Sequence, residues 1–252
     1  MKDTIRHKII ELAEKYEQPE FIKDDPIQFP LRYHDIKDIE IVGFIASWLA
    51  YGNRKVILKT CEELLKVMSG YSVSPYDFII NGKYIQMSRQ YGITKSLYRF
   101  YTYADFYDLC DSLRNIYKHH STIEDALFSK LQHNLLAVAP VQALIDLFPN
   151  EVKGVPKDTH SACKRLCMFM RWMARKNSPV DIGVWERFDQ RFLLIPLDTH
   201  VARIGRELGL ITAKRDNMNT VLELTTACRE VFPLDPCKCD FALFGYGVTH
   251  KM

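Results

Sequence analysis

The chain has 252 residues, of which 47% are hydrophobic, and a formal net charge of +3. This length and composition predict a buried core in one large domain or in two small ones. The sequence has no apolar run long enough to cross a bilayer, and it starts without the apolar region of a signal peptide. We therefore expect a cytoplasmic protein that does not bind membranes.

Helical periodicity dominates the sequence, and strand patterns are sparse. The predicted helices cover, in chain order, residues 5–13, 39–51, 56–68, 104–119, 123–132, 160–175, 199–208, 218–231 and 240–245. Glycine, proline and asparagine residues mark turns between many of them, and none of these turns is long enough to be a flexible linker between independent domains. The sequence therefore predicts an all-α protein.

Positive charge is concentrated in one part of the chain. Residues 151–215 contain thirteen Lys or Arg and seven Asp or Glu, so the excess there is 13 − 7 = +6. In the predicted helix 160–175, Lys164, Arg171 and Arg175 fall almost opposite the apolar face. This pattern is typical of a solvated basic face, and it is also what a phosphate-binding protein presents to a polyanion.

The seven cysteines are odd in number and scattered, which is not the pattern of a secreted disulfide framework. We expect reduced thiols. Cys237 and Cys239 lack the partners that a zinc site or an iron–sulfur cluster needs. No pair of histidines has ligand spacing with a supporting carboxylate. The sequence therefore predicts no metal site and no cofactor.

One motif stands at the end of an apolar run, where Phe192–Leu210 reads FLLIPLDTHVARIGRELGL. Pro196 restrains Leu197 to an extended backbone, so Asp198 is predicted to be the N-cap of the helix that follows. The ordinary role of such a carboxylate is to accept hydrogen bonds from free backbone N–H groups, which contributes about 1 kcal/mol. A catalytic role for Asp198 has to be weighed against this capping role.

In combination, several blocks resemble the helix-hairpin-helix DNA glycosylases, the superfamily of endonuclease III, adenine glycosylase and the 8-oxoguanine glycosylases. LDTHVARIGRELGL resembles the segment with the catalytic aspartate, and SACKRL at 161–166 resembles the helix that carries a lysine nucleophile in bifunctional members. IASWLAYGNR at 45–54 is similar to the first core helix and the loop that approaches DNA. DFALFGYG at 240–247 is similar to the last core helix. The chain resembles still more closely a family of uncharacterised bacterial proteins with the same blocks.

The resemblance implies a DNA-glycosylase-like fold of two helical subdomains with a cleft between them. One subdomain would cover residues 39–149, and the other residues 1–38 and 150–252, with the hairpin segment and the PLDTH motif. The implied function is a base-excision N-glycosylase that acts, as a monomer, on a damaged base flipped from double-stranded DNA. The implied catalytic residues are Asp198 and, for an AP-lyase step, Lys164. The implied DNA-binding residues are Tyr51, Gly52, Asn53, Arg54, Lys157, Arg165, Arg171, Arg175, His200 and Arg203.

The sequence departs from the superfamily at the hairpin segment, Gly154 to His160, which reads GVPKDTH. It keeps one glycine of the usual two, and Pro156 removes an N–H that could bind a phosphate. The sequence thus leaves open whether Lys164 is a nucleophile. It also leaves open a non-catalytic nucleic-acid-binding protein of the same fold, and a helical interaction module without nucleic acid. The aromatic residues that could stack on a base, or belong to the core, are Trp48, Tyr51, Trp172 and Trp185.

Overall fold

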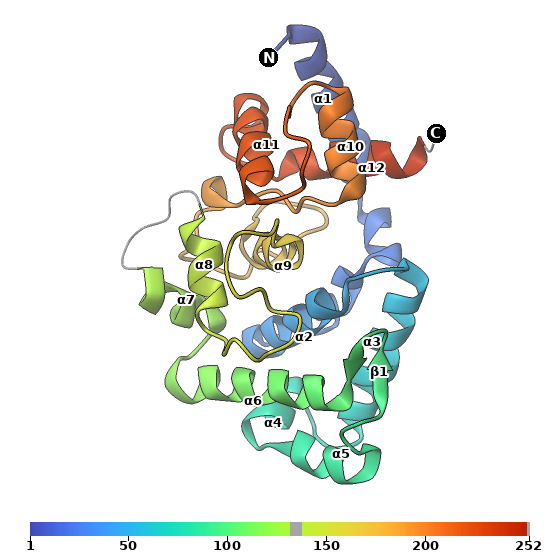
Figure 1. Ribbon diagram of the computed structural model, residues 1–252, viewed down its shortest axis with the longest axis vertical. Helices are drawn as coiled ribbons and strands as arrows, with labels where there is room; N and C mark the ends of the chain where they lie inside the picture. The colour runs from blue at the N-terminus through green and yellow to red at the C-terminus, as the bar shows by residue number, and fades with distance from the viewer. Residues whose placement is uncertain (132–137, 251–252) are drawn as a thin grey trace. The chain divides into compact units, whose positions relative to one another are not determined.

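The computed structural model describes residues 1–131 and 138–250. Almost all of its regular structure is helical, which confirms the all-α prediction (Figure 1). The α-helices are α1 (Asp3–Tyr16), α2 (Ile36–Leu49), α3 (Arg54–Ser69), α4 (Pro75–Ile80), α5 (Lys83–Tyr91), α6 (Tyr103–His119), α7 (Ile123–Leu131), α8 (Ala139–Ile145), α9 (Lys164–Ala174), α10 (Thr199–Glu207), α11 (Met218–Val231) and α12 (Lys238–Thr249). Four 3-10 turns, η1 (Pro19–Asp24), η2 (Pro26–Gln28), η3 (Pro30–Arg32) and η4 (Gln190–Phe192), and the strands β1 (Ser96–Tyr98) and β2 (Tyr101–Thr102) complete the described part.

The predicted helices that have long apolar stripes all form, and α11 has the predicted bounds. Helix α9 begins at Lys164, where 160 was expected, because residues 160–163 are extended or irregular. Helices α4, α5 and α8 and the β1–β2 pair were not predicted. Helix α4 has a recognisable start, since Ser74 accepts a hydrogen bond from the Asp77 N–H and Pro75 follows it. Residue 132, at the end of one predicted helix, lies outside the described residues.

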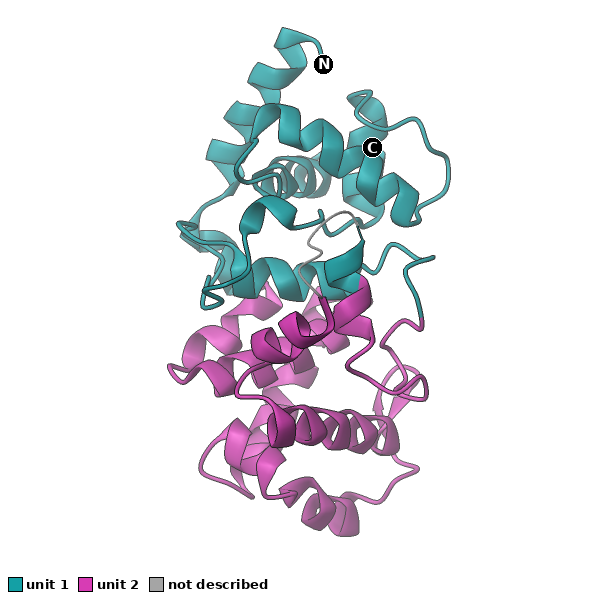
Figure 2. Cartoon of the chain, turned by 90° about the vertical axis from the view of Figure 1, so that its left-hand side faces the viewer, with its two compact units in different colours: residues 1–23, 135–141, 158–252 teal, residues 24–134, 142–157 magenta. Residues whose placement is uncertain are grey.

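The chain divides into two compact units (Figure 2). Unit 1 comprises residues 1–23, 135–141 and 158–252, and unit 2 comprises residues 24–134 and 142–157. The first boundary lies at residue 24, where the sequence suggested 39, because η2 and η3 pack against α2. The last boundary lies after residue 157, where the sequence suggested 149. The hairpin segment 154–160 therefore crosses from one unit to the other along the chain.

Helix α2 is the central helix of unit 2 and is buried on nearly all sides. The helix contains one buried glutamate, Glu40, whose hydrogen bonds explain why a carboxylate is tolerated in this apolar segment. The Glu40 carboxylate accepts hydrogen bonds from the Tyr117 hydroxyl (2.8 Å) and from the backbone N–H groups of Ile123 (2.8 Å) and Glu124 (3.2 Å). A carboxylate from a distant part of the chain thus accepts hydrogen bonds from the backbone N–H groups at the start of α7, which have no partner within that helix. Helix α6 lies along α4 and α5 in the same unit (Figure 1).

Helix α12 organises unit 1 because α1 and α10 both pack against it. Two glycines permit this close approach. A Cβ added to Gly245 would lie 2.3 Å from Cγ of Tyr16 on α1, and one added to Gly247 would lie 3.1 Å from Cβ of His200 on α10. The glycines in DFALFGYG are therefore explained by helix packing, independently of any function.

Candidate active site and nucleic-acid interface

Asp198 is the N-cap of α10, as its sequence predicts. Its Oδ1 atom accepts hydrogen bonds from the N–H groups of His200 and Val201, each at 2.9 Å. Its Oδ2 atom has no hydrogen-bond partner in the part of the chain that the structure describes, and the residue is half-buried. The cap uses one carboxylate oxygen and leaves the other available to a ligand.

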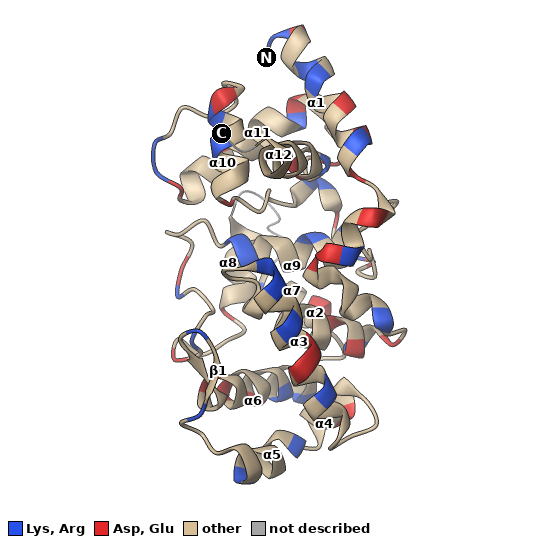
Figure 3. Ribbon diagram, turned by 90° about the vertical axis from the view of Figure 1, so that its right-hand side faces the viewer, with Lys and Arg blue, Asp and Glu red and all other residues tan. Residues whose placement is uncertain are grey.

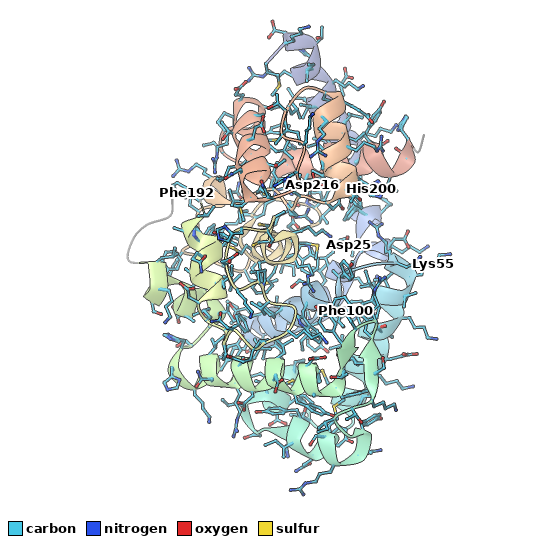
Figure 4. All side chains as sticks on the ribbon, viewed as in Figure 1. Asp25, Lys55, Phe100, Phe192, His200 and Asp216 are labelled. Atoms are coloured by element: carbon cyan, nitrogen blue, oxygen red, sulfur yellow. The ribbon has the colours of Figure 1, made fainter. Side chains whose placement is uncertain are left out.

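The first turn of α10 is held in place by α12. The His200 ring lies edge-on to the Phe244 ring, with 6.0 Å between the ring centroids, at the start of α10 (Figure 4). Arg203 donates a hydrogen bond to the Gly247 carbonyl at 2.8 Å and another to Glu207, also at 2.8 Å. Both His200 and Arg203 are half-buried. Each has a packing role, and each keeps an exposed part that could approach a phosphate.

Lys164 is the first residue of α9 and is half-buried, as is Arg165 beside it. The residue before it, Cys163, has φ of +47°, a left-handed conformation that turns the chain into the helix. The first turn of α9 contains no acidic side chain. A cation at this position faces the positive end of the helix dipole, which is an unfavourable place for it.

The buried carboxyl group of Asp240 shows that Lys164 and Asp198 share one electrostatic neighbourhood in unit 1. Burial raises the pKa of Asp240 to about 6, against the attraction of Arg171. The negative charge of Asp198 raises that pKa further, whereas the positive charge of Lys164 lowers it. Three chain segments far apart in sequence, at residues 164, 198 and 240, therefore bring their charges within range of each other.

Arg171 and Arg175 were expected to bind DNA, and the structure corrects this expectation. They are 3% and 1% exposed. Arg171 donates to Asp181 at 3.1 Å and to Asp240. Arg175 donates to Asp181 and makes a two-pronged contact with Asp235, with every donor–acceptor distance at 2.9 Å or less. Because buried guanidinium groups need carboxylate partners, these two arginines lie inside the unit and present no face to a phosphate.

The same network includes Glu17, the C-cap of α1, which pairs with Arg175 at 2.6 Å. The Phe241 ring lies beneath both guanidinium groups, with its centroid 4.7 Å from Arg171 Cζ and 5.1 Å from Arg175 Cζ. Two arginines thus face four carboxyl groups, a formal charge of 2 − 4 = −2 if all are ionised. Burial is the main cause of the raised pKa of Asp240 in this network, and the negative charges of Asp198 and Asp181 add to it.

The hairpin segment does not form a tight turn between two helices, since residues 146–163 connect α8 to α9. Gly154 has φ of +91°, and a Cβ there would lie 2.5 Å from Trp48 Nε1 and on the hydroxyl of Tyr101. The Trp48 indole donates to the Lys153 carbonyl at 2.8 Å. The surviving glycine is therefore required by packing in unit 2. Lys157 is exposed.

The loop from Tyr51 to Arg54 connects α2 to α3 in unit 2. Tyr51, Gly52 and Asn53 are exposed and Arg54 is half-buried. The Asn53 side chain caps α3 by accepting from the Lys55 N–H at 3.0 Å. Of the four aromatic residues that were stacking candidates, Tyr51 is 48% exposed, whereas the three tryptophans, Trp48, Trp172 and Trp185, are at most 2% exposed and belong to the core.

Sequence reasoning missed Arg99 and Phe100, which form the turn between β1 and β2 and lie beside Tyr51. The signal was present as Tyr98-Arg99-Phe100-Tyr101, in which an arginine stands among three aromatic residues. It also missed Asp240. That residue reads as an ordinary first-turn acid of α12, because nothing local shows that it is buried against Arg171.

Within the described residues, no group of three or more His, Cys, Asp or Glu side chains could hold a metal ion. All seven cysteines lie in the described parts of the chain, where each is a buried free thiol. No helix in those parts is long and apolar enough to span a membrane.

Comparison with known proteins places the chain in a family. No curated protein and no solved structure matches it. A family model described as "Protein of unknown function (DUF2400)" matches residues 25–249. That match covers most of the 252 residues, and it includes Tyr51, Lys164, Asp198 and Asp240. The chain therefore belongs to the family described as protein of unknown function, DUF2400.

Proposed function

We propose that this protein is a base-excision N-glycosylase that acts on a damaged base flipped out of double-stranded DNA. The observation that carries the proposal is the Asp198 carboxylate. One of its oxygens is held by two backbone N–H groups at the start of α10, and the other has no hydrogen-bond partner among the described residues. The charges of Asp198 and Lys164 both act on the buried carboxyl group of Asp240. The proposal includes the two-subdomain, glycosylase-like fold that the sequence resemblance implies, and a monomer as the active form.

In this mechanism, Asp198 acts on the sugar of the flipped nucleotide. The bond between C1′ and the base breaks, its electron pair leaves with the base, and positive charge develops on the sugar. A carboxylate fixed at that point stabilises the developing charge, and fixed electrostatic stabilisation is commonly the largest single contribution to catalysis. Water then adds to C1′ and gives up a proton, which balances the released base. The α10 N–H groups orient the carboxylate without using its second oxygen.

Lys164 supports a second step in the same proposal. After base release, the amine attacks C1′ of the ring-opened sugar and forms a Schiff base with loss of water. Removal of a C2′ proton then expels the 3′ phosphate, which breaks the C3′–O bond and cleaves the strand. Lys164 has a position suited to this role, because it is half-buried at the start of α9 and its charge acts on the same buried carboxyl group as that of Asp198. The nucleophile must be the neutral amine.

Two observations weaken part of the resemblance to the glycosylases, and the alternative is a nucleic-acid-binding protein of the same fold without base release. Gly154 is required for packing against Trp48 and Tyr101, and Arg171 and Arg175 are enclosed in ion pairs. Three of the features that suggested phosphate binding at the hairpin and along α9 thus have structural explanations.

The test is a panel of duplex oligonucleotides, each with one damaged base, assayed separately for base release and for strand cleavage. Base release by the wild-type protein that Asp198→Asn abolishes supports the glycosylase. Trapping of a covalent adduct by borohydride, lost in Lys164→Met, supports the lyase step. Binding to every duplex without release from any of them would replace the glycosylase by the non-catalytic alternative.

A further inference from the structure

Three exposed side chains meet at one edge of unit 2, and we name them the stacking cluster: Tyr51, Arg99 and Phe100. Tyr51 comes from the α2–α3 loop, and the other two form the β1–β2 turn (Figure 4 labels Phe100). Tyr51 is 48% and Phe100 is 49% exposed. Single exposed apolar side chains are common on protein surfaces, whereas exposed apolar side chains that adjoin one another can mark a binding site.

The three side chains are close enough to act as one surface. The Tyr51 and Phe100 ring centroids are 5.5 Å apart with 57° between the ring planes, so the two rings meet at an angle. The Arg99 guanidinium lies over the Tyr51 ring, with Cζ 4.9 Å from the ring centroid. The cluster therefore combines aromatic faces and a planar cation on the surface of the unit.

The backbone beneath the cluster is held in an unusual conformation. Arg99 has φ of +53°, which a non-glycine residue seldom adopts, and Gly52 has φ of +109°. A Cβ at Gly52 would lie 2.4 Å from Nη1 of Arg99. The Tyr98 hydroxyl donates to the Tyr51 carbonyl, which ties the loop to the strand pair. Such backbone strain persists only where surrounding contacts maintain it, and it occurs most often at functional sites.

Buried partners hold the base of the β1–β2 turn. Tyr101 is fully buried and stacks on Trp48, with ring centroids 4.0 Å apart and 21° between the planes. Lys153 donates to the Phe100 carbonyl. The exposed rings thus stand on a rigid support, so they lose little conformational freedom when they bind a ligand.

The charges around the cluster complement a polyanion. Besides Arg99, the Lys153 ammonium lies 5.7 Å from the Phe100 ring centroid, where it also pairs with Asp105 at 3.3 Å. Helix α3 begins with Arg54 and Lys55, and its first turn has no acidic residue (Figure 3). Proteins that bind single-stranded nucleic acids commonly combine exposed aromatic rings with neighbouring positive charges.

We propose that the stacking cluster binds an unpaired base of a nucleic-acid strand, with Tyr51 and Phe100 stacking on the base and Arg99 contacting its face or the adjacent phosphate. This goes beyond the proposed glycosylase activity. It needs no damaged base, and it uses no residue of unit 1.

The experiment measures binding of the full-length protein to three fluorescent probes by anisotropy. The probes are a single-stranded oligodeoxythymidine, an abasic strand of the same length and charge, and a blunt duplex. We expect the base-containing single strand to bind most tightly, because the abasic strand offers phosphates without bases to stack on. The double variant Tyr51→Ala, Phe100→Ala should bind it about five- to a hundredfold more weakly. Its affinity for the abasic strand should change little.

Two further variants keep the result interpretable. Tyr51→Trp with Phe100→Trp retains aromatic faces and should keep the affinity. Ile85→Ala removes an equally exposed apolar side chain, 49% exposed on α5 in the same unit, and should have no effect. Since all these side chains are exposed, thermal melting should show every variant folded.

Three results would overturn the proposal. These are no binding to the single strand, equal binding of the base-containing and abasic strands, and unchanged affinity in the double alanine variant. Equal loss with all three probes would point to phosphate binding alone. If the protein releases no damaged base but binds the single strand as expected, the glycosylase proposal fails and the proposal for the stacking cluster stands.

Discussion

Arg171 on α9 and Asp240 on α12 form a buried ion pair, although 69 residues separate them in the chain. Arg171 also binds Asp181, so one guanidinium joins α9, the chain that follows it, and α12. The pair lies in the same electrostatic neighbourhood as Asp198 and Lys164. The arginines that looked like a DNA-binding surface thus stabilise the unit that carries the candidate catalytic residues.

Replacing Arg171 should reveal this structural role. Arg171→Met removes one partner of a buried network and leaves carboxylates without compensation, so the free energy of unfolding should fall by about 3–5 kcal/mol. Chemical denaturation measures it. Lys157→Met is the control, because Lys157 is exposed and its loss should change stability by less than about 0.5 kcal/mol. An Arg171→Met protein as stable as the wild type would contradict the assignment.

The capping and catalytic roles of Asp198 can be separated by Asp198→Asn. Asparagine caps a helix as well as aspartate, so stability should change by less than about 1 kcal/mol. Base release on the lesion found in the panel should fall by roughly a hundredfold or more, because the charge that stabilises the transition state is removed. The readouts are thermal melting and single-turnover base release.

The matched control is Asp35→Asn. Asp35 caps α2 in the same way, accepting from the Lys37 N–H at 2.8 Å, but it belongs to unit 2. Its replacement should leave base release unchanged. Near-normal release by a folded Asp198→Asn protein would reduce Asp198 to a helix cap.

Asp240 should make stability depend on pH. Its pKa in the folded protein is about 6, raised from an ordinary 3.8 by burial, with Asp198 and Asp181 adding to the rise and Arg171 and Lys164 opposing it. Between about pH 4 and 6 the folded state binds the proton more strongly than the unfolded state, so this group's contribution to stability falls as the pH rises through that window. This shift of about two pKa units corresponds to a change of at most about 3 kcal/mol in the free energy of unfolding across the window.

The measurement is the free energy of unfolding of the wild type and of Asp240→Asn at several pH values from 4 to 7. Asparagine cannot titrate, so the difference between the two proteins should change across the window in the variant's favour as the pH rises. The absolute stability of the variant also reflects its altered contact with Arg171, and for that reason the slope is the quantity to compare. Parallel curves would show that Asp240 does not titrate there.

Gly245 should be sensitive to one added methyl group. A Cβ at this position would lie 2.3 Å from Cγ and 2.6 Å from Cβ of Tyr16, atoms close to the backbone of α1 that cannot move aside easily. Gly245→Ala should therefore lower the free energy of unfolding by about 1–3 kcal/mol. In the Tyr16→Gly background, which removes the Tyr16 Cβ as well as the ring, the same substitution should cost much less. Additive losses in the double variant would rule out this contact as the cause.

The sequence predicted those parts of the fold that depend on interactions between residues a few positions apart in the chain. Asp198 before the apolar stripe of Val201 and Ile204 predicted an N-cap, and the cap is present because its hydrogen bonds join residues two and three positions apart. The bounds of α11 were predicted for the same reason, since helix periodicity repeats every few residues. Short elements such as α4 and the β1–β2 pair were missed, because a few residues carry too little periodic signal.

What the sequence alone determined is the all-α class, most of the long helices and the helix start at Asp198, since all three depend on interactions between near neighbours in the chain. Only the tertiary structure decided what the charged and aromatic residues do. Arg175 meets Asp235 across 60 residues, which turned an apparent basic surface into a buried network. Tyr51 meets Phe100 and Arg99 across a similar separation. Such pairings form because buried charges require opposite charges and because strained turns require supporting contacts. In both cases the partner is distant in the chain, so it cannot be identified from the neighbouring sequence.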